Sequence, residues 1–521
     1  VDGSGSTFIM EGGSITQNTA TYTGDNAGGG VYVTKGSSFT VSGDVEISGN
    51  KGNGKDNNVY LPTDYYDTVT ITIANELEDE ASIGVTMEEP REGSPLTFAT
   101  VGEGCSLTDD VAAHFTSDQE YFPYRMDGEN EVKMFRRELQ KHPICGEEVC
   151  PHTPKHPDVI WIGVSKLSNI EKDSKYSNYY LVGDFTGKGE ALSDSYNVNL
   201  CLHGYTYSGG IRFQSRNYTL CDCKGTGKIT GSSTQYGIQL ISGGRLDMYG
   251  GKITGNTTVG AHVENGTFNM YGGEITENYY TGADGGAGGV RVDESGTFNM
   301  SGNAKVSDNT ATFNSRYDDA SGVYYGAAGV YVNGGKFTMT ENAKVSGNTL
   351  TDNVSGSPNN YAGGVYVRNA EGSNVTVGGN VTITGNKKGS ADSNVCLPKG
   401  QTIKVSGTLK ENAIGVITET PINVVGEEAV IAEGIGSYSL TKADVSTFSS
   451  DAGIPADFED GKIIFRKGVH KHYICGKEGC SDSHSHGTDK KWTAISTLSE
   501  INGAGYYFLT KDVELNNTGF A

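Results

Sequence analysis

The sequence is short of positive charge. Lys and Arg total 40 against 63 Asp and Glu, so the formal net charge is −23. Nucleic-acid binding needs a basic surface to meet the phosphates, and this balance argues against it. An acidic, self-repelling surface suits a protein that is exposed to solvent. We therefore expect no nucleic-acid partner.

Long apolar runs are also missing. No stretch approaches the roughly 18 apolar residues that a spanning helix needs, so we expect no membrane insertion in this segment. The chain does not start at Met and shows no signal-peptide pattern. Its first and last residues already read as parts of repeats. We therefore expect a segment of a longer protein whose export and anchoring signals lie outside it.

What the sequence has in excess is glycine, 75 of 521 residues, arranged in repeats. Between residues 245 and 386 similar segments follow one another, and each ends in an asparagine. These asparagines are Asn256, Asn278, Asn309, Asn348 and Asn386. The first interval is 22 residues and the later ones are 31, 39 and 38, which we interpret as 22 residues plus inserted loops. Such a period is typical of a solenoid.

Within each repeat the apolar residues alternate, which predicts strands. Phe268, Phe298 and Phe337 occupy equivalent inward positions. Three short strands per 22 residues, broken by Gly and Asn turns, predict one rung of an all-β parallel β-helix. A single rung cannot bury its apolar face, so rungs must stack. The asparagines would then form a hydrogen-bonded ladder at one corner, because Asn tolerates left-handed backbone.

A second period of 330 residues relates two Cys/His-rich stretches, at 142–156 and 472–486. It predicts repeated units joined by small linker modules. The expected parts are the last rungs of a first β-helix unit (1–62), a strand-rich closing segment (63–140), a Cys/His linker module (141–160), a complete β-helix (161–400), a second closing segment (401–469), a second linker module (470–487) and the start of a third unit (488–521).

Both Cys/His stretches have the spacing His-x2-Cys-x4-Cys-x5-His. The candidate metal ligands are His142, Cys145, Cys150 and His156, and His472, Cys475, Cys480 and His486. Two thiolates and two imidazoles can close a tetrahedral zinc site, so structural zinc is the expected cofactor. The alternatives are disulfides, Cys145–Cys150 and Cys475–Cys480, or free thiols. Four protein ligands leave no position for a catalytic water. A metal would staple a linker that has little apolar core.

Three further cysteines lie close together in the repeat pattern. Cys201 precedes Cys221 and Cys223 by about one rung. The three side chains could pair or stack as buried thiols, and the second arrangement is favoured because free cysteine is among the most buried residue types.

One outward-facing residue per rung forms a predicted column. Its members are Gln239, His262, Arg291, Tyr331 and Tyr366. We expect a flat, exposed strip there, and tyrosine rings can stack on sugars. Hydrolysis of a polysaccharide needs paired carboxylates, and this column contains no acid, so we predict binding rather than catalysis.

The inserted loops carry more tyrosines, including Tyr324 and Tyr325. Insertions on one face of a solenoid often mark a binding face, although they can also be solvated decorations. The candidate ligand-binding residues are therefore His262, Arg291, Tyr331, Tyr366, Tyr324 and Tyr325.

Several stretches of the sequence are similar to those of a known class of proteins. “VNLCLHGYTY”, “TLCDCKGTGKITG”, “GTFNMYGGEITEN” and “NVYLP” together resemble the large, repeat-bearing β-helix adhesin-like surface proteins of Gram-positive anaerobic bacteria, many from gut communities. The resemblance covers nearly the whole chain. It implies a right-handed, pectate-lyase-like β-helix, Sec-dependent export, and anchoring to the cell wall elsewhere in the polypeptide. It transfers no catalytic residues, since fold likeness says little about chemistry.

These observations together predict a non-enzymatic, exported cell-surface protein that acts as an adhesin or a structural stalk. Its partners would be host or microbial glycans or surface proteins, and zinc would staple the joints between its units. One alternative is a polysaccharide lyase or hydrolase. Another is a filament subunit that assembles with its own copies through the segments 63–140 and 401–469.

Overall fold

The computed structural model describes the chain except residues 22–27, 65–66, 88–94, 103–110, 120, 126–128, 148–149, 151–154, 168–169, 171–176, 193–195, 232–235, 283–285, 314–324, 353–360, 369–373, 411–412, 473–489, 502 and 510–521. The chain divides into two compact units. The first comprises Val1–Lys141, Val159–Val164 and Asp173–Asn178, and the second comprises His142–Asp158, Ser165–Lys172 and Tyr179–Ala521. Both are built almost entirely of strands in mainly parallel sheets, as expected of a β-solenoid-like class.

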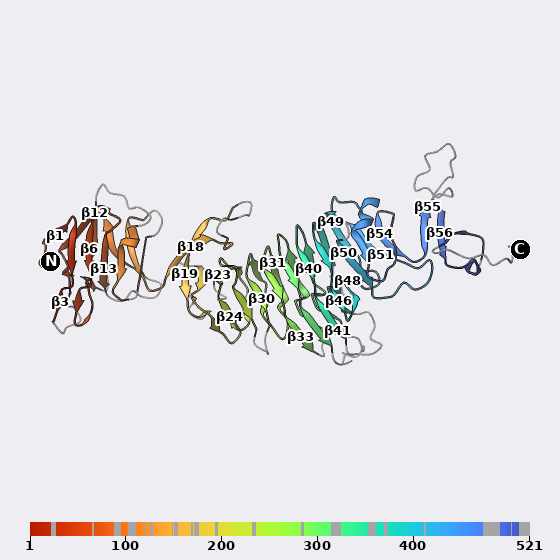
Figure 1. Cartoon of the computed structure of the whole chain (residues 1–521), viewed down its shortest axis with the longest axis horizontal. Coiled ribbons are helices and arrows are strands. Elements are labelled where there is room, and N and C mark those ends of the chain that lie inside the picture. The colour runs from red at the N-terminus through yellow and green to blue at the C-terminus, as the bar shows by residue number, and fades with distance from the viewer. Residues whose placement is uncertain are drawn as a thin grey trace, which may run out of the picture. The chain divides into compact units, whose positions relative to one another are not determined.

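The second unit stacks its strands in three parallel columns (Figure 1). The first column contains β22 (Glu190–Ala191), β25 (Ile211–Gln214), β28 (Ile238–Ile241), the start of β31 (Ala261–Met270), the start of β34 (Val290–Met300), β38 (Val330–Asn333), β43 (Val365–Val367) and β48 (Val395–Leu397). The second contains β23 (Val198–Cys201), β26 (Asn217–Cys221), β29 (Gly244–Met248), the ends of β31 and β34, β39 (Lys336–Met339), β44 (Asn374–Gly379) and β49 (Ile403–Leu409). The third contains β21 (Phe185–Thr186), β24 (Thr206–Ser208), β27 (Lys228–Thr230), β30 (Lys252–Thr254), β32 (Glu274–Thr276), β35 (Lys305–Ser307), β40 (Lys344–Ser346), β45 (Thr382–Thr384) and β50 (Ile414–Thr418).

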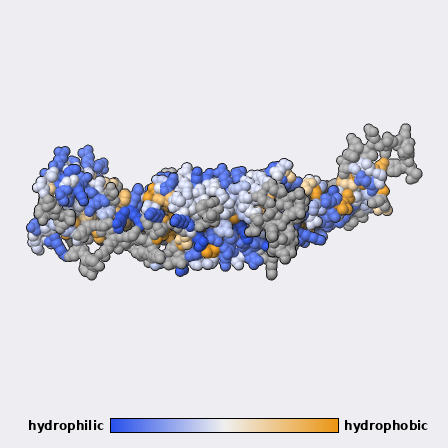
Figure 2. All heavy atoms as spheres, turned by 90° about the horizontal axis from the view of Figure 1, so that it is seen from below, coloured by the Kyte–Doolittle hydropathy of each residue, from blue (hydrophilic) through white to orange (hydrophobic). Residues whose placement is uncertain are grey.

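The core of this unit is a set of internal files of apolar side chains. Phe268 pairs with Phe298, and Phe298 with Phe337, in unbroken register. Their rings stack with centroids 5.1 and 5.3 Å apart, and all three side chains are fully buried. The predicted inward file is therefore confirmed. Figure 2 shows one face of the molecule, on which hydrophilic and neutral residues predominate and apolar spots are scattered.

The asparagine ladder is also confirmed. From Asn256 through Asn278, Asn309, Asn348, Asn386 and Asn394, each Nδ2 donates to the Oδ1 of the next asparagine over 2.6–3.0 Å. Asn394 then donates to the carboxylate of Asp451 over 2.8 Å. One expectation was wrong: the left-handed backbone belongs to the residue before each of the five asparagines that end a repeat, such as Glu277 (φ 55°) before Asn278 or Asp308 (φ 55°) before Asn309. The side-chain amide of each asparagine instead donates a hydrogen bond to the asparagine of the neighbouring rung.

The insertions begin as strands rather than as loops. After the asparagine corner, β33 (Tyr279–Gly282), β36 (Thr310–Phe313), β41 (Thr349–Asp352) and β46 (Lys387–Lys388) pair in parallel and form a fourth column. Phe313 and Tyr361 stack beside this column, with centroids 4.9 Å apart. The inserted segments thus carry a small apolar cluster of their own.

The parallel stack of each unit ends in an antiparallel closure. In the second unit β51 (Glu428–Gly434) pairs in parallel with β49 and antiparallel with β54 (Lys462–Arg466), which also pairs with β53 (Ala456–Glu459). In the first unit β14 (Leu96–Val101) pairs in parallel with β12 (Ile71–Leu77) and antiparallel with β17 (Glu131–Phe135), which also pairs with β16 (Phe122–Arg125).

The parallel stack of the first unit has the same three columns. The first contains β4 (Val31–Tyr32) and β9 (Val59–Leu61), the second contains β1 (Thr7–Met10), β5 (Ser38–Gly43) and β12, and the third contains β2 (Gly13–Thr16), β6 (Val45–Ser48), β13 (Ser82–Met87) and β15 (Phe115–Ser117). β9 also pairs with β13, as β48 pairs with β50. The two units therefore share one topology.

Candidate metal centre and the buried polar column

The described residues of the Cys/His segment (142–158) contact the strand stack of the second unit, at Gly146 beside Cys221 and at His156 beside Tyr249. The segment follows β18 (Leu139–Pro143) and turns at Gly146, whose N–H donates to the carbonyl of Pro143 over 2.9 Å. Gly146 has φ +78°, and a Cβ there would lie 3.1 Å from Cys221 and 3.2 Å from the backbone nitrogen of Cys223. Both the left-handed backbone and the close approach to β26 therefore favour glycine.

Three predicted ligands converge beyond this turn. The ligand atoms of Cys145, Cys150 and His156 all lie within 4.8 Å of one another. Both cysteines are buried thiols, and the backbone N–H of His156 donates to the sulfur of Cys150 over 3.2 Å. The imidazole of His156 packs edge-on to Tyr249, with ring centroids 5.0 Å apart. This group could hold a metal ion.

Burial raises the pKa of the Cys145 thiol to about 11. A metal ion would therefore have to displace its proton, since thiolate rather than thiol is the ligand. The neighbouring sulfurs of Cys145 and Cys150 are not joined in a disulfide.

The fourth predicted ligand, His142, does not belong to this group. It lies instead with Cys201 and Cys223 of the stack, so the expected grouping of four must be corrected. His142 is still on strand β18, whereas Cys145 stands within the turn that the hydrogen bond from Gly146 to Pro143 closes. Cys201 and Cys221 pair in register as buried thiols, as the sequence favoured.

The second Cys/His stretch is largely outside the described residues. This applies to Cys475, Cys480 and His486. The backbone of His472 ends β55 (Val469–His472), which pairs antiparallel with β56 (Lys490–Ile495).

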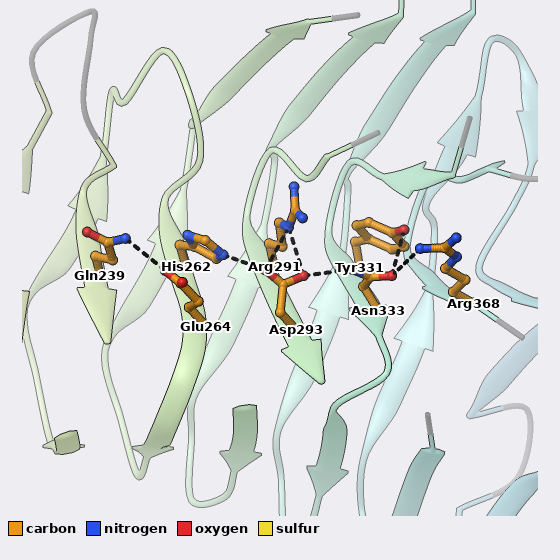
Figure 3. A network of polar contacts seen from close by, with 8 residues as sticks. All are labelled: Gln239, His262, Glu264, Arg291, Asp293, Tyr331, Asn333 and Arg368. Carbon is orange, nitrogen blue, oxygen red and sulfur yellow. Dashed lines mark hydrogen bonds and ion pairs between the residues drawn. The ribbon is translucent and has the colours of Figure 1, made fainter. Parts of the chain in front are cut away.

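The predicted column of outward residues exists and is in register. Gln239 pairs with His262, His262 with Arg291, Arg291 with Tyr331, and Tyr331 with Tyr366. Figure 3 shows most of these side chains along neighbouring strands of the stack.

The expected exposure of this column is wrong. His262 is 6% exposed, Tyr331 3% and Tyr366 fully buried, while Arg291 is half-buried. Side chains from the segments that lead into these strands pack against the column, namely Tyr236, Val259, Ala287, Tyr325, Ala327 and Ala362. Tyr325 stacks on Tyr366, with centroids 5.7 Å apart, and Tyr324 lies outside the described residues. The column is thus a second, outer core rather than an exposed strip.

This column also has an acid that the sequence reasoning missed. The carboxylate of Asp293 lies 2.7 Å from Nε2 of His262 and 3.0 Å from Nε of Arg291 (Figure 3). It also accepts from Nδ2 of Asn333 over 2.8 Å. The alternation in Arg291-Val292-Asp293 could have revealed it, because residues two apart on a strand face the same side.

The polar contacts of Asp293 hold it ionised. Burial alone would raise its pKa, but the hydrogen bond with His262 and the charge of Arg291 outweigh burial and lower the pKa to about 2. General acid–base catalysis needs a pKa near the working pH. The contacts of Asp293 instead connect three successive rungs.

In comparisons with known proteins, no family model, curated protein or solved structure matches the chain. Among the described residues, none of the helical segments has the length and hydrophobicity required to cross a bilayer.

Proposed function

We propose that the chain is part of a structural stalk of an exported cell-surface protein, in which right-handed parallel β-helix units alternate with metal-binding Cys/His linkers. The observation that carries this proposal is the duplication of one architecture. In the first unit Asn50 donates to Asn58, eight residues on, and Asn58 donates to Asp118. In the second unit Asn386 donates to Asn394, also eight residues on, and Asn394 donates to Asp451.

A protein built from repeated units of one architecture is suited to a role in which the length of the molecule matters, such as that of a stalk. Each unit has its own core and its own terminated ladder, so units can be added in series without a change in their interiors. The likeness of the repeat wording to adhesin-like surface proteins supports the extracellular location, and the acidic composition agrees with it.

The buried polar column favours a stalk over the carbohydrate-active alternative. A sugar-binding strip or a catalytic acid requires side chains that a substrate can reach. Tyr331 and Tyr366 are covered by the inserted segments, and Asp293 is occupied by His262, Arg291 and Asn333. Glycans or surface proteins, if they are partners, would have to bind outside this column.

Zinc is the metal that we propose for the group of Cys145, Cys150 and His156. Two thiolates and an imidazole match the ligand preference of zinc, and the buried setting suits a structural ion. The metal would order a segment that has few apolar residues.

Small-angle X-ray scattering of the full chain tests the stalk. A compact globule of this length would have a radius of gyration of about 24 Å. A stalk should exceed that value clearly and remain monomeric as concentration rises. A value near that of a globule, or the release of reducing or unsaturated ends from a panel of polysaccharides, would refute the proposal. Growth of the particle with concentration would point to the filament alternative.

A further inference from the structure

We propose that His142, Cys201 and Cys223 form a second metal site, separate from the centre at Cys145, for a thiophilic divalent cation such as Zn²⁺. Their ligand atoms lie within 4.8 Å of one another. This site stands on its own geometry and does not depend on the stalk function. Its effect would be to fasten the Cys/His segment to the first rungs of the stack.

Two adjacent strands supply the sulfurs. Cys201 ends β23 and Cys223 follows β26, and these strands pair in parallel with Cys201 opposite Cys221. The sulfurs of Cys201 and Cys223 are 3.5 Å apart. Two thiolates on one tetrahedral zinc, each at about 2.3 Å, are separated by roughly 3.8 Å. The rung spacing therefore already sets the thiols at a separation close to that of a metal-bound pair.

His142 supplies a nitrogen with a defined tautomer. Its Nδ1 lies 2.9 Å from the carbonyl oxygen of Pro143. A carbonyl can only accept, so Nδ1 carries the proton and Nε2 keeps its lone pair. This Nε2 atom is buried. Metal-bound histidines commonly have this arrangement, with one nitrogen bound to a carbonyl and the other to the metal.

His203 lies at the edge of this group rather than within it. Its Nδ1 is 3.0 Å from the sulfur of Cys223, while the three residues whose ligand atoms all lie within 4.8 Å of one another are His142, Cys201 and Cys223. His203 has a left-handed backbone (φ 51°), and its ring packs against Tyr180 with centroids 4.9 Å apart. The group itself offers two sulfurs and one imidazole, which are ligand types that zinc prefers.

The two centres share no ligand among the described residues, so they can be removed one at a time. We would measure zinc per chain by elemental analysis of the 521-residue chain after loading with Zn²⁺ and desalting. The Cys201→Ser/Cys223→Ser variant should lose one equivalent relative to wild type, and so should His142→Ala. Cys145→Ser/Cys150→Ser should lose a different equivalent, so that the combined variant loses two.

Cys396→Ser is the matched control, because Cys396 is a buried thiol of the same stack that belongs to neither group. It should retain all the zinc of the wild type. Full zinc binding by the Cys201→Ser/Cys223→Ser variant would overturn the second site and leave the Cys145 centre and the stalk untouched.

A measurement on the wild type guards against a variant that fails to fold. Cys223 is half-buried, so an alkylating reagent can reach it. In the chelator-treated chain Cys223 should react, and addition of Zn²⁺ should slow its alkylation at least tenfold, as read by mass spectrometry. An alkylation rate at Cys223 that zinc does not change would also overturn the site.

Discussion

At the scale of single residues, the polar groups inside this protein are stabilised by the rung above or below. Asn309 has no exposed surface, yet its Nδ2 donates to Asn348 and to the carbonyl of Ile275, and its Oδ1 accepts from Asn278. Asp293 similarly contacts His262 on the preceding rung and Asn333 on the following one. Buried polar groups are tolerated only when hydrogen-bonded, and here the repeat itself provides the partners.

Replacement of Asn309 by alanine should be severe for this reason. It removes the acceptor of the backbone N–H and the side-chain amide of Asn278. It also removes the amide that donates to Oδ1 of Asn348 and to the carbonyl of Ile275. We expect the free energy of unfolding to fall by on the order of 3 kcal/mol, measured by urea denaturation. Asn380→Ala is the control, since the hydrogen bond of Asn380 to Asn342 is exposed. Equal effects of the two changes would contradict a buried ladder.

The lowered pKa of Asp293 predicts that the stability of the folded protein depends on pH. This pKa is lowered from 3.8 to about 2 in the folded protein, so the unfolded chain binds the proton more readily. The stabilisation is therefore complete above about pH 4 and is lost as the pH falls towards 2. Asp293→Asn should destabilise the protein by about 2 kcal/mol at pH 7. The difference from wild type should shrink at pH 2.5, and a difference that stays constant would refute the assignment.

At the scale of elements, the sequence pattern predicted the strands and corners that recur in every rung, and it missed the structure of the inserted segments, which do not recur. The files of Phe268, Phe298 and Phe337 and the asparagine corner recur with every rung, so alternation and spacing alone revealed them. The insertions differ in length and share no period. Their strands, and the cover that they place over Tyr331 and Tyr366, arise from contacts between distant residues.

The metal groups show the same limit. The local spacing of the motif correctly predicted that Cys145, Cys150 and His156 lie close together. It could not show that His142 lies beside Cys201 and Cys223, because about 60 to 80 residues separate His142 from the two cysteines, which the pairing of β23 with β26 brings together. The asparagine that precedes Asp451 in the ladder, Asn394, was missed because it interrupts the regular interval.

Close packing between strands predicts a strict need for glycine at Gly329. A Cβ there would lie 2.5 Å from the carbonyl oxygen of Gly364 on the next rung, a backbone atom that cannot move alone. Gly329→Ala should therefore separate β38 from β43 and cost on the order of 2 kcal/mol. Gly407→Ala, where nothing lies within 4 Å, should be nearly neutral. Thermal unfolding followed by circular dichroism distinguishes the two, and a neutral Gly329→Ala would show that the rungs can shift.

At the scale of the whole molecule, the two compact units have separate interiors. Phe39 belongs to a cluster of buried side chains made entirely by residues 10–134. Phe298 lies in the file of the second unit, between Phe268 and Phe337. Each unit also ends its own ladder on an aspartate, Asp118 or Asp451. Cooperative unfolding follows the contacts within a core, so two transitions are expected rather than one.

Calorimetry of the full chain should therefore resolve two transitions that respond to different changes. Phe39→Ala should lower only one midpoint and Phe298→Ala only the other, each through a loss of about 3–5 kcal/mol of core packing. The described candidate metal ligands all belong to the second unit. Removal of metal by a chelator should consequently lower the midpoint that Phe298→Ala lowers and leave the other in place, because a ligand stabilises only the folded unit that binds it. A chelator that lowered both midpoints equally, or neither, would contradict a metal held within the second unit alone.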